Sequence, residues 1–349
     1  MIHVGVDLHQ RFCYMTALDS RGRQLNAQAV ANERAALQAY FRQFRKPVRA
    51  AVEACSFWPA FRAAVGEQVE LRMVHPMRVK AIAAAKLKND RIDSATLAHL
   101  LRCDLLPEAW MADEATRELR QQVRLRATLV RQRTRLKNQV HAILHQHGLK
   151  AGGGTDLFGK AGRVWLRQAR VGHKAQDALN TYLKLIDEFT VHVDQQDHEV
   201  KRFVSGDQRA QWLMTIPGIG QYSAMLLLAE IGDIQRFTRP RALSNYAGLV
   251  PWMRESADKR RSGGITRVGS PWLRWIMVEA AQVAVRTSPA VRCYFERLCR
   301  RKHRNVAVVA VARKLLVAVW ALLQHGECFD QTTFVRDCGK DGAARLGKR

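Results

Sequence analysis

The chain has 349 residues, of which 57 are basic and 31 acidic, so its formal net charge is +26. A soluble protein this basic usually binds a polyanion, most often nucleic acid. Its hydrophobic fraction of 47% excludes a disordered basic tail, and its length predicts two or three domains.

The sequence also argues against a secreted, disulfide-bonded or membrane-spanning protein. Its seven cysteines are widely spaced and form no C-x-x-C pair, which is typical of reduced thiols in the cytosol. The start, "MIHVGVDLHQ", lacks the plan of a signal peptide. The most apolar stretch, residues 305–323, carries Arg313 and Lys314 at its centre, which indicates a core helix.

The first hundred residues alternate between strand and helix patterns, which predicts an α/β N-terminal domain over residues 1–108. The order strand, strand, strand, helix, strand, helix, strand, helix is that of a RuvC-like or ribonuclease-H-like domain, although periodicity alone also allows other three-layer α/β folds. The predicted strands are 2–8, 11–19, 22–30, 48–55 and 69–76, and the predicted helices are 32–45, 57–68 and 77–102.

Residues 109–205 are predicted to form a helical arm. One long helix over 113–146 has apolar residues near heptad spacing, a glycine-containing segment interrupts it, and a second helix covers 177–204. An antiparallel pair within one chain and a dimerising coiled coil both fit this pattern. Residues 117–137 contain eight basic residues and one acidic residue, which predicts nucleic-acid binding. The candidate contacts are Arg117, Arg120, Arg124, Arg131 and Arg135.

A mostly helical third region is predicted over 206–335, with a loosely ordered basic tail at 336–349. Its opening "IPGIG" resembles the turn of a helix-hairpin-helix, in which the backbone amides of Gly218 and Gly220 would bind phosphate. A tight turn between packed helices explains the glycines equally well.

A polar loop is expected over 245–275, between two helical stretches. It contains Ser256, Ser262 and Ser270. A serine surrounded by arginines can attack phosphorus, because guanidinium groups neutralise the developing charge. On this stretch alone, loop serines beside DNA-binding arginines are the simpler interpretation. The candidate nucleic-acid contacts are Lys259, Arg260, Arg261, Arg267 and Arg274.

Four carboxylates stand where a ribonuclease-H-like metal site needs them. Asp7 lies in the first strand, Glu53 near the end of the strand expected beside it, and Asp90 and Asp93 one helical step apart. Each alone has a structural explanation, such as a cap or an arginine pair. Together they predict a catalytic site for Mg²⁺, with Mn²⁺ as a possible substitute, because converging carboxylates repel one another without a cation. Two such ions stabilise the entering and leaving oxygens of a phosphodiester.

The segments "GVDLH", "AVEAC", "KLKNDRIDSATLA", "IPGIG", "LSNYAGLVP", "GGITRVGS" and "AVARKLL" follow in this order over residues 2–330. Together they resemble the DEDD-type insertion-sequence transposases, relatives of the Piv and MooV DNA invertases. The resemblance implies a RuvC-like domain that binds magnesium through Asp7, Glu53, Asp90 and Asp93. It also implies a C-terminal serine that becomes covalently joined to DNA.

The resemblance further implies donor and target DNA as substrates, a guide (bridge) RNA encoded by the element, and a homodimer that assembles to a tetramer. It places the protein on DNA in the bacterial cytoplasm. The family's serine directly precedes glycine, whereas Ser256 precedes Ala257 and Ser262 precedes Gly263. Counting from the flanking motifs favours Ser256 as the nucleophile and keeps Ser262 as the rival. Two alternatives to a recombinase remain: a junction-resolving nuclease that uses water, and a non-catalytic architectural protein.

Overall fold

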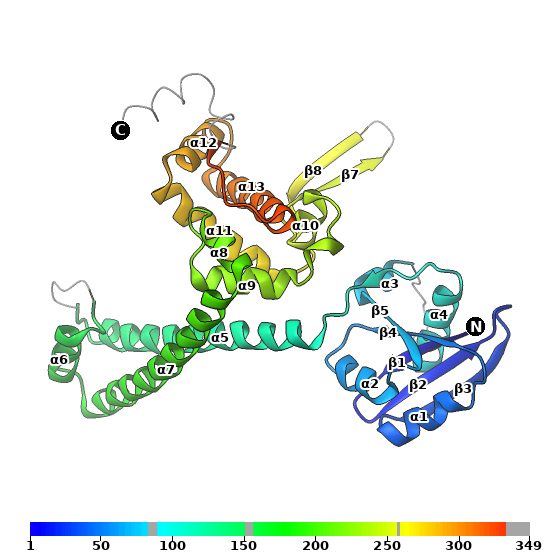
Figure 1. The fold of residues 1–349 in the computed structure, drawn as a ribbon. Coiled ribbons are helices and arrows are strands. Elements are labelled where there is room, and N and C mark those ends of the chain that lie inside the picture. The colour runs from blue at the N-terminus through cyan, green and yellow to red at the C-terminus, as the bar shows by residue number, and fades with distance from the viewer. Residues whose placement is uncertain (83–88, 151–155, 257–258, 333–349) are drawn as a thin grey trace. The chain divides into compact units, whose positions relative to one another are not determined.

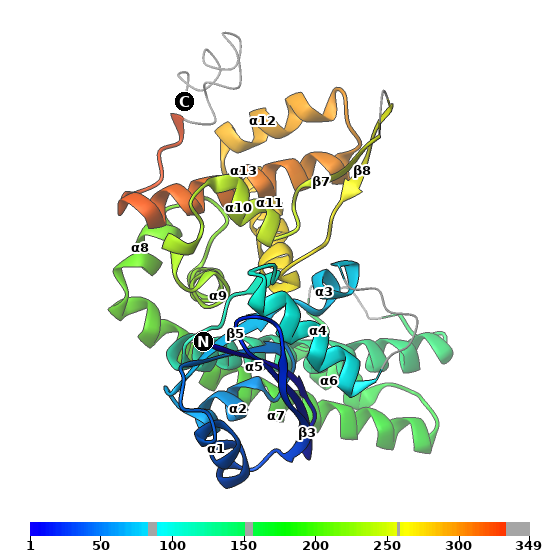
Figure 2. The same ribbon diagram turned by 90° about the vertical axis from the view of Figure 1, so that its right-hand side faces the viewer.

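The computed structural model describes residues 1–82, 89–150, 156–256 and 259–332. The predicted basic tail at 336–349 lies outside the described residues. The chain divides into two compact units, Met1–Ala112 and Asp113–Arg349 (Figures 1 and 2).

A six-stranded mixed sheet forms the centre of the first unit, in the order β3-β2-β1-β4-β5-β6. The first three strands form an antiparallel meander, the fourth and fifth run parallel to the first, and the short sixth is antiparallel to the fifth. The predicted order of strands and helices is confirmed as far as β5, but two helices follow instead of one, and β6 was not predicted. The strands are β1 (Ile2–Leu8), β2 (Phe12–Leu18), β3 (Gln24–Ala31), β4 (Val48–Glu53), β5 (Val69–Val74) and β6 (Glu108–Ala109).

Helices cover both faces of this sheet. On one face, α1 (Arg34–Arg42) and α2 (Trp58–Val65) pack on alternate residues of β1, such as Val4 and Val6, to form the main core. The opposite face of β1 carries His3, Gly5 and Asp7, because successive side chains of a strand alternate between its two faces. The helix α4 (Asp90–Arg102) packs there.

Gly5 permits a close approach between β1 and α4. A Cβ atom at this position would lie 1.9 Å from the Ser94 carbonyl oxygen and 2.5 Å from the Ala98 backbone nitrogen. The side chains of Thr16 and Ser94 share a buried hydrogen bond of 2.8 Å beside this contact. Gly5 therefore allows α4, which carries Asp90, to lie close to β1, which carries Asp7.

The single helix predicted over 77–102 is wrong. The structure has α3 (Pro76–Ile82) and a separate α4 that begins at Asp90. Asn89 has extended backbone angles, and its side chain accepts a hydrogen bond of 2.8 Å from the Ile92 amide. This N-cap starts a new helix at Asp90, because it satisfies one of the amides that lack a partner in a first turn.

The second unit begins with two long helices that pack against each other, α5 (Glu114–Gln146) and α7 (His173–Gly206), with α6 (Lys160–Gln168) between them in sequence. Arg126 pairs with Asp197, and Arg133 donates to Thr190. Because the later residue of α5 contacts the earlier residue of α7, the two helices run antiparallel. Their distal core contains Val140, Leu144, Leu166, Leu179, Leu183 and Ile186.

The rest of this unit is a helical bundle with one hairpin. Its largest apolar cluster contains residues that are far apart in sequence, such as Met225 and Leu315. The helices are α8 (Gln208–Met214), α9 (Gln221–Ile231), η1 (Ile234–Arg236), α10 (Pro240–Tyr246), α11 (Pro271–Thr287), α12 (Pro289–Cys299) and α13 (Arg304–His325). By length and composition α13 is apolar enough to cross a membrane, but it buries Val311, Leu315 and Val319 in this core.

The loop predicted over 245–275 is also wrong in its middle part. The strands β7 (Pro251–Ser256) and β8 (Lys259–Ile265) form an antiparallel hairpin in which Ser256 pairs with Lys259. Trp252 stacks over Gly263 on the opposite strand, since a Cβ there would lie 2.4 Å from its ring. Residues 257 and 258 lie outside the described residues.

Candidate metal centre and nucleic-acid interface

The four predicted carboxylates come from three elements of the first unit. Val6 of β1 pairs with Val52 of β4, so the next residues, Asp7 and Glu53, occupy neighbouring positions at the same edge. Asp90 and Asp93 both lie in the first turn of α4, and α4 packs on the face of β1 that carries Asp7. Residues far apart in sequence thus share one edge of the sheet.

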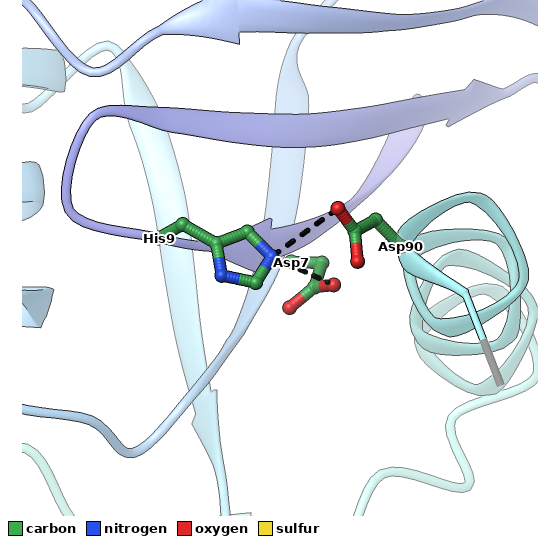
Figure 3. Close-up of side chains that lie close together, drawn as sticks. All are labelled: Asp7, His9 and Asp90. Carbon is green, nitrogen blue, oxygen red and sulfur yellow. Dashed lines mark ion pairs between the residues drawn. The ribbon is translucent and has the colours of Figure 1, made fainter.

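Asp7, Asp90 and His9 form a tight group (Figure 3). The His9 Nε2 atom lies 3.3 Å from an Asp7 carboxylate oxygen and 3.4 Å from an Asp90 carboxylate oxygen. All three potential ligand atoms lie within 4.8 Å of one another. Although buried, this Nε2 atom makes no hydrogen bond of acceptable geometry within the described part of the chain. One nitrogen and two carboxylates pointing at a common centre fit a divalent cation.

The electrostatics of Asp7 favour a positive partner. Burial raises the pKa of this carboxyl above its ordinary value, and nearby Asp90 and Asp93 raise it further, while His9 opposes them. The side chain is only 20% exposed. A largely buried carboxylate beside two others needs a nearby cation to stay charged, because burial and like charge both disfavour ionisation.

The strand register places Glu53 beside Asp7, and Asp93 lies close enough to affect the pKa of Asp7. Neither belongs to the group of three ligand atoms within 4.8 Å, which comprises Asp7, His9 and Asp90. Sequence analysis did not select His9 as a ligand. The available signal was its spacing, since it follows Asp7 by two residues and so can lie on the same side of the extended chain.

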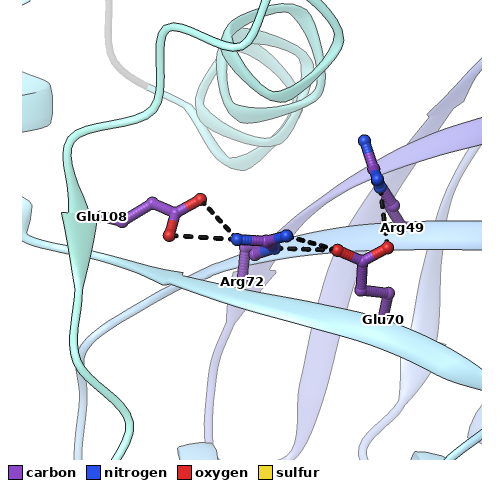
Figure 4. Close-up of polar contacts among 4 residues, drawn as sticks. All are labelled: Arg49, Glu70, Arg72 and Glu108. Atoms are coloured by element: carbon purple, nitrogen blue, oxygen red, sulfur yellow. Dashed lines mark hydrogen bonds and ion pairs between the residues drawn. The ribbon is translucent and has the colours of Figure 1, made fainter. Parts of the chain in front are cut away.

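The same face of the sheet carries a second ionic cluster (Figure 4). Glu70 accepts from Arg49 at 2.7 Å and from Arg72 at 2.5 Å, and Arg72 also reaches Glu108 of β6 at 3.0 Å. Hydrogen bonds from Arg49 and Arg72 lower the pKa of Glu70. Arginines therefore balance these carboxylates, whereas the described ion pairs of the Asp7 and Asp90 carboxylates are to a single imidazole.

The candidate serines lie on the hairpin of the second unit. Ser256 ends β7, and Ser262 lies in β8 opposite Met253. Lys259, Arg260 and Arg261 begin β8 and pair with the strand of Ser256. The backbone therefore places both serines and the basic run on one two-stranded ribbon. Beyond it, Arg267 is exposed with a φ of 54°, and Arg274 donates to the Ala247 carbonyl at 3.1 Å.

The candidate arginines of α5 differ in their surroundings. Arg120 donates to the carbonyls of Ala229 and Glu230 at 2.8 and 2.9 Å. Arg124 donates twice to the carboxylate of Glu230, which is 1% exposed. These two arginines fasten α5 to the end of α9.

Arg131 and Arg135 are exposed on the same helix, and Arg117 lies one turn before Arg120. Arg131 stacks over the ring of Trp272 at 4.4 Å from its centroid. Arg131 and Arg135 thus keep their charge at the surface of α5, in contrast to the two arginines that fasten it to α9.

The "IPGIG" turn connects α8 to α9. Gly218 has a φ of +86°, and a Cβ there would lie 2.1 Å from the Ala280 carbonyl oxygen of α11. The tight packing of the turn against α11 thus explains this glycine. Gly220 is exposed at the N-cap of α9, with open space where a Cβ would stand.

Comparison with known proteins finds transposases along the chain. Residues 4–148 match a transposase family model of the DEDD type represented by IS110, and residues 210–296 match the transposase IS116/IS110/IS902 family. A transposase for insertion sequence element IS1111A of Coxiella burnetii is 27% identical over 80% of this chain and 78% of its own length.

Two further relatives extend this picture. A probable family 20 transposase of Pseudomonas aeruginosa is 26% identical over 93% of this chain and 98% of its own length. A pilin gene-inverting protein of Moraxella bovis is 29% identical over 45% of this chain and 52% of its own length. The chain belongs to the DEDD-type insertion-sequence transposases and is a DNA-recombining enzyme.

Proposed function

We propose that this transposase cleaves and exchanges DNA strands in a reaction that depends on Mg²⁺ held by Asp7, Glu53, Asp90 and Asp93. The observation that carries the proposal is the convergence of Asp7 and Asp90 on one imidazole nitrogen, at an edge where Glu53 and Asp93 also lie. When bound there, divalent cations supply positive charge to the phosphodiester oxygens. The four carboxylates provide the hard oxygen ligands that magnesium prefers.

In this proposal Ser256 is the nucleophile. Its hydroxyl oxygen forms a bond to the phosphorus, one ester bond of the DNA backbone breaks, and the leaving oxygen receives the serine proton to become a free hydroxyl. A hydroxyl from the recombining strand then attacks the phosphoserine ester and restores the serine. The basic run Lys259, Arg260 and Arg261, which pairs with the strand of Ser256, neutralises the charge that develops on phosphorus.

The proposed substrates are donor and target DNA, recognised with a guide RNA by a homodimer that assembles into a tetramer. The net charge of +26 and the exposed arginines of α5 support polyanion binding. The long helices α5 and α7 are the proposed dimerising, coiled-coil arm, and the first unit is the proposed RuvC-like domain. The relatives' names include both an insertion element and a gene-inverting protein, so the proposed reaction could lead to either insertion or inversion of DNA.

The test combines purified protein, DNA carrying the element's ends, co-expressed flanking RNA and magnesium, resolved on a denaturing gel. Wild type is compared with Ser256→Ala and Ser262→Ala. We expect a protein–DNA adduct that survives denaturation and disappears only in Ser256→Ala. Loss only in Ser262→Ala would move the nucleophile to that residue. Cleaved DNA without an adduct in any lane would contradict the serine step and favour a nuclease that uses water.

A further inference from the structure

Two tryptophans of α11 and one arginine of α5 form a small aromatic surface on the second unit. The rings of Trp272 and Trp275 meet edge to face, with centroids 6.1 Å apart. The Arg131 guanidinium lies 4.4 Å from the centroid of Trp272 and 5.9 Å from that of Trp275. Trp275 is 37% exposed, a large value for a tryptophan, whose burial would otherwise be favourable.

A buried polar cluster fixes this aromatic surface in place. Ser270 caps α11 by accepting from the Leu273 amide, and its hydroxyl donates to Glu230 at 2.8 Å. The other Glu230 oxygen accepts from Arg124 at 2.7 Å. Glu230 therefore connects α5, α9 and the start of α11, and the two tryptophans follow Ser270 directly in the first turns. A pre-ordered surface loses little entropy when it binds a ligand.

The charge around this surface remains available for an anion. Arg124 is paired with Glu230 and Arg126 with Asp197. For Arg131 the contacts recorded in the described part of the chain are the two aromatic rings. Arg135 is exposed one helical turn further along α5, where residues four apart share a face. Among the described residues Arg131 has no ion pair with a carboxylate, so its positive charge lies beside an exposed indole and can meet an anion.

We propose that the surface formed by Trp272, Trp275 and Arg131 binds an unpaired base of nucleic acid by stacking, while Arg131 and Arg135 contact the flanking phosphates. Aromatic side chains stack on bases of any sequence, and arginine adds a cation–π contribution. Inside a duplex the faces of the bases are already covered by their neighbours, so away from the duplex ends only a single-stranded or extruded base can stack on Trp275. The site thus selects unpaired strands over duplex.

This inference goes beyond the proposed strand-transfer chemistry and does not depend on it. Binding is therefore measured with the full chain in EDTA, where metal-dependent cleavage cannot occur. The probes are a fluorescein-labelled oligo-dT strand and a duplex of the same length, followed by fluorescence anisotropy at several salt concentrations. The variants are Trp275→Ala, Trp275→Phe and Arg131→Gln, with Leu125→Ala as the control. Leu125 is 47% exposed on α5, so its substitution by alanine also removes exposed apolar surface.

We expect Trp275→Ala to weaken binding of the single strand by about fivefold or more, since one stacked base contributes about 1–3 kcal/mol. Duplex binding should change by less than about twofold, and Trp275→Phe should retain most of the affinity. Arg131→Gln should reduce the slope of log K against log salt by about 0.7 on the single strand, the value for one phosphate. Leu125→Ala should bind both probes like wild type.

Equal losses on single strand and duplex in Trp275→Ala would overturn the proposal, as would no loss on either. A change in oligomeric state with unchanged oligo-dT binding would also overturn it and assign the surface to a protein partner. If Trp275→Ala does not fold, Arg131→Gln still decides. An unchanged salt slope in Arg131→Gln would then contradict the phosphate contact.

Discussion

Gly5→Ala should separate β1 from α4, and so disrupt the group of Asp7, His9 and Asp90 without changing a carboxylate. The new Cβ would lie 1.9 Å from the Ser94 carbonyl oxygen, whereas non-bonded heavy atoms pack at about 3.5 Å, so α4 must withdraw by roughly 1.5 Å. Overpacking of this kind costs about 1–3 kcal/mol. Loss of the buried Thr16–Ser94 hydrogen bond adds about 1 kcal/mol. We therefore expect α4 to be destabilised by about 2–4 kcal/mol.

Hydrogen exchange followed by mass spectrometry measures this effect directly in the full chain. A loss of 2 kcal/mol should speed exchange of α4 amides about 30-fold, with α13 as an internal reference. Gly206→Ala is the matched control, because nothing lies within 4 Å of the position of its Cβ. If the α4 amides of Gly5→Ala exchange within about twofold of wild type, the close contact between β1 and α4 does not exist as described.

Three further predictions concern charge. Burial raises the pKa of Asp7, so its contribution to stability is present at low pH and is lost as the pH rises through its folded pKa. As the pH rises from 4 to 8 without metal, Asp7→Asn should therefore lose less stability than wild type, as measured by thermal melts. Mg²⁺ at ten times its dissociation constant should stabilise wild type by about 1.4 kcal/mol, and Asp90→Asn should show no such shift in a magnesium titration. Glu230→Ala leaves Arg124 without its carboxylate and should cost about 3 kcal/mol; calorimetry showing an unchanged melting temperature would contradict the role of this buried pair.

The sequence predicted five strands of the sheet and the elements that carry the four carboxylates, because both depend on local patterns. Alternating apolar residues identify the strands, and strand ends determine which residues share an edge. The family resemblance then linked Asp7 to Asp90. His9 was missed because its contact with Asp90 depends on how closely α4 approaches, and that distance is set by Gly5.

Other features were beyond local patterns. The hairpin β7–β8 was predicted as a loop because β8 contains a run of three basic residues and two glycines, and neither strand shows alternating apolar residues. Arg124 and Glu230 are separated by 106 residues, so no spacing rule pairs them. The aromatic surface of Trp272 and Arg131 depends on the same long-range packing of α5 against α11.

The most direct measurement of the central claim is magnesium-dependent strand cleavage by Asp7→Asn, alongside its DNA affinity. The assay uses the element's ends with the co-expressed flanking RNA, and wild type establishes that the substrate is competent. We expect Asp7→Asn to bind this DNA within about twofold of wild type, because duplex affinity comes mainly from basic residues, and to yield no cleaved strand at any magnesium concentration. Cleavage by Asp7→Asn at the wild-type rate would contradict the assignment of the edge of β1, β4 and α4 as the metal centre.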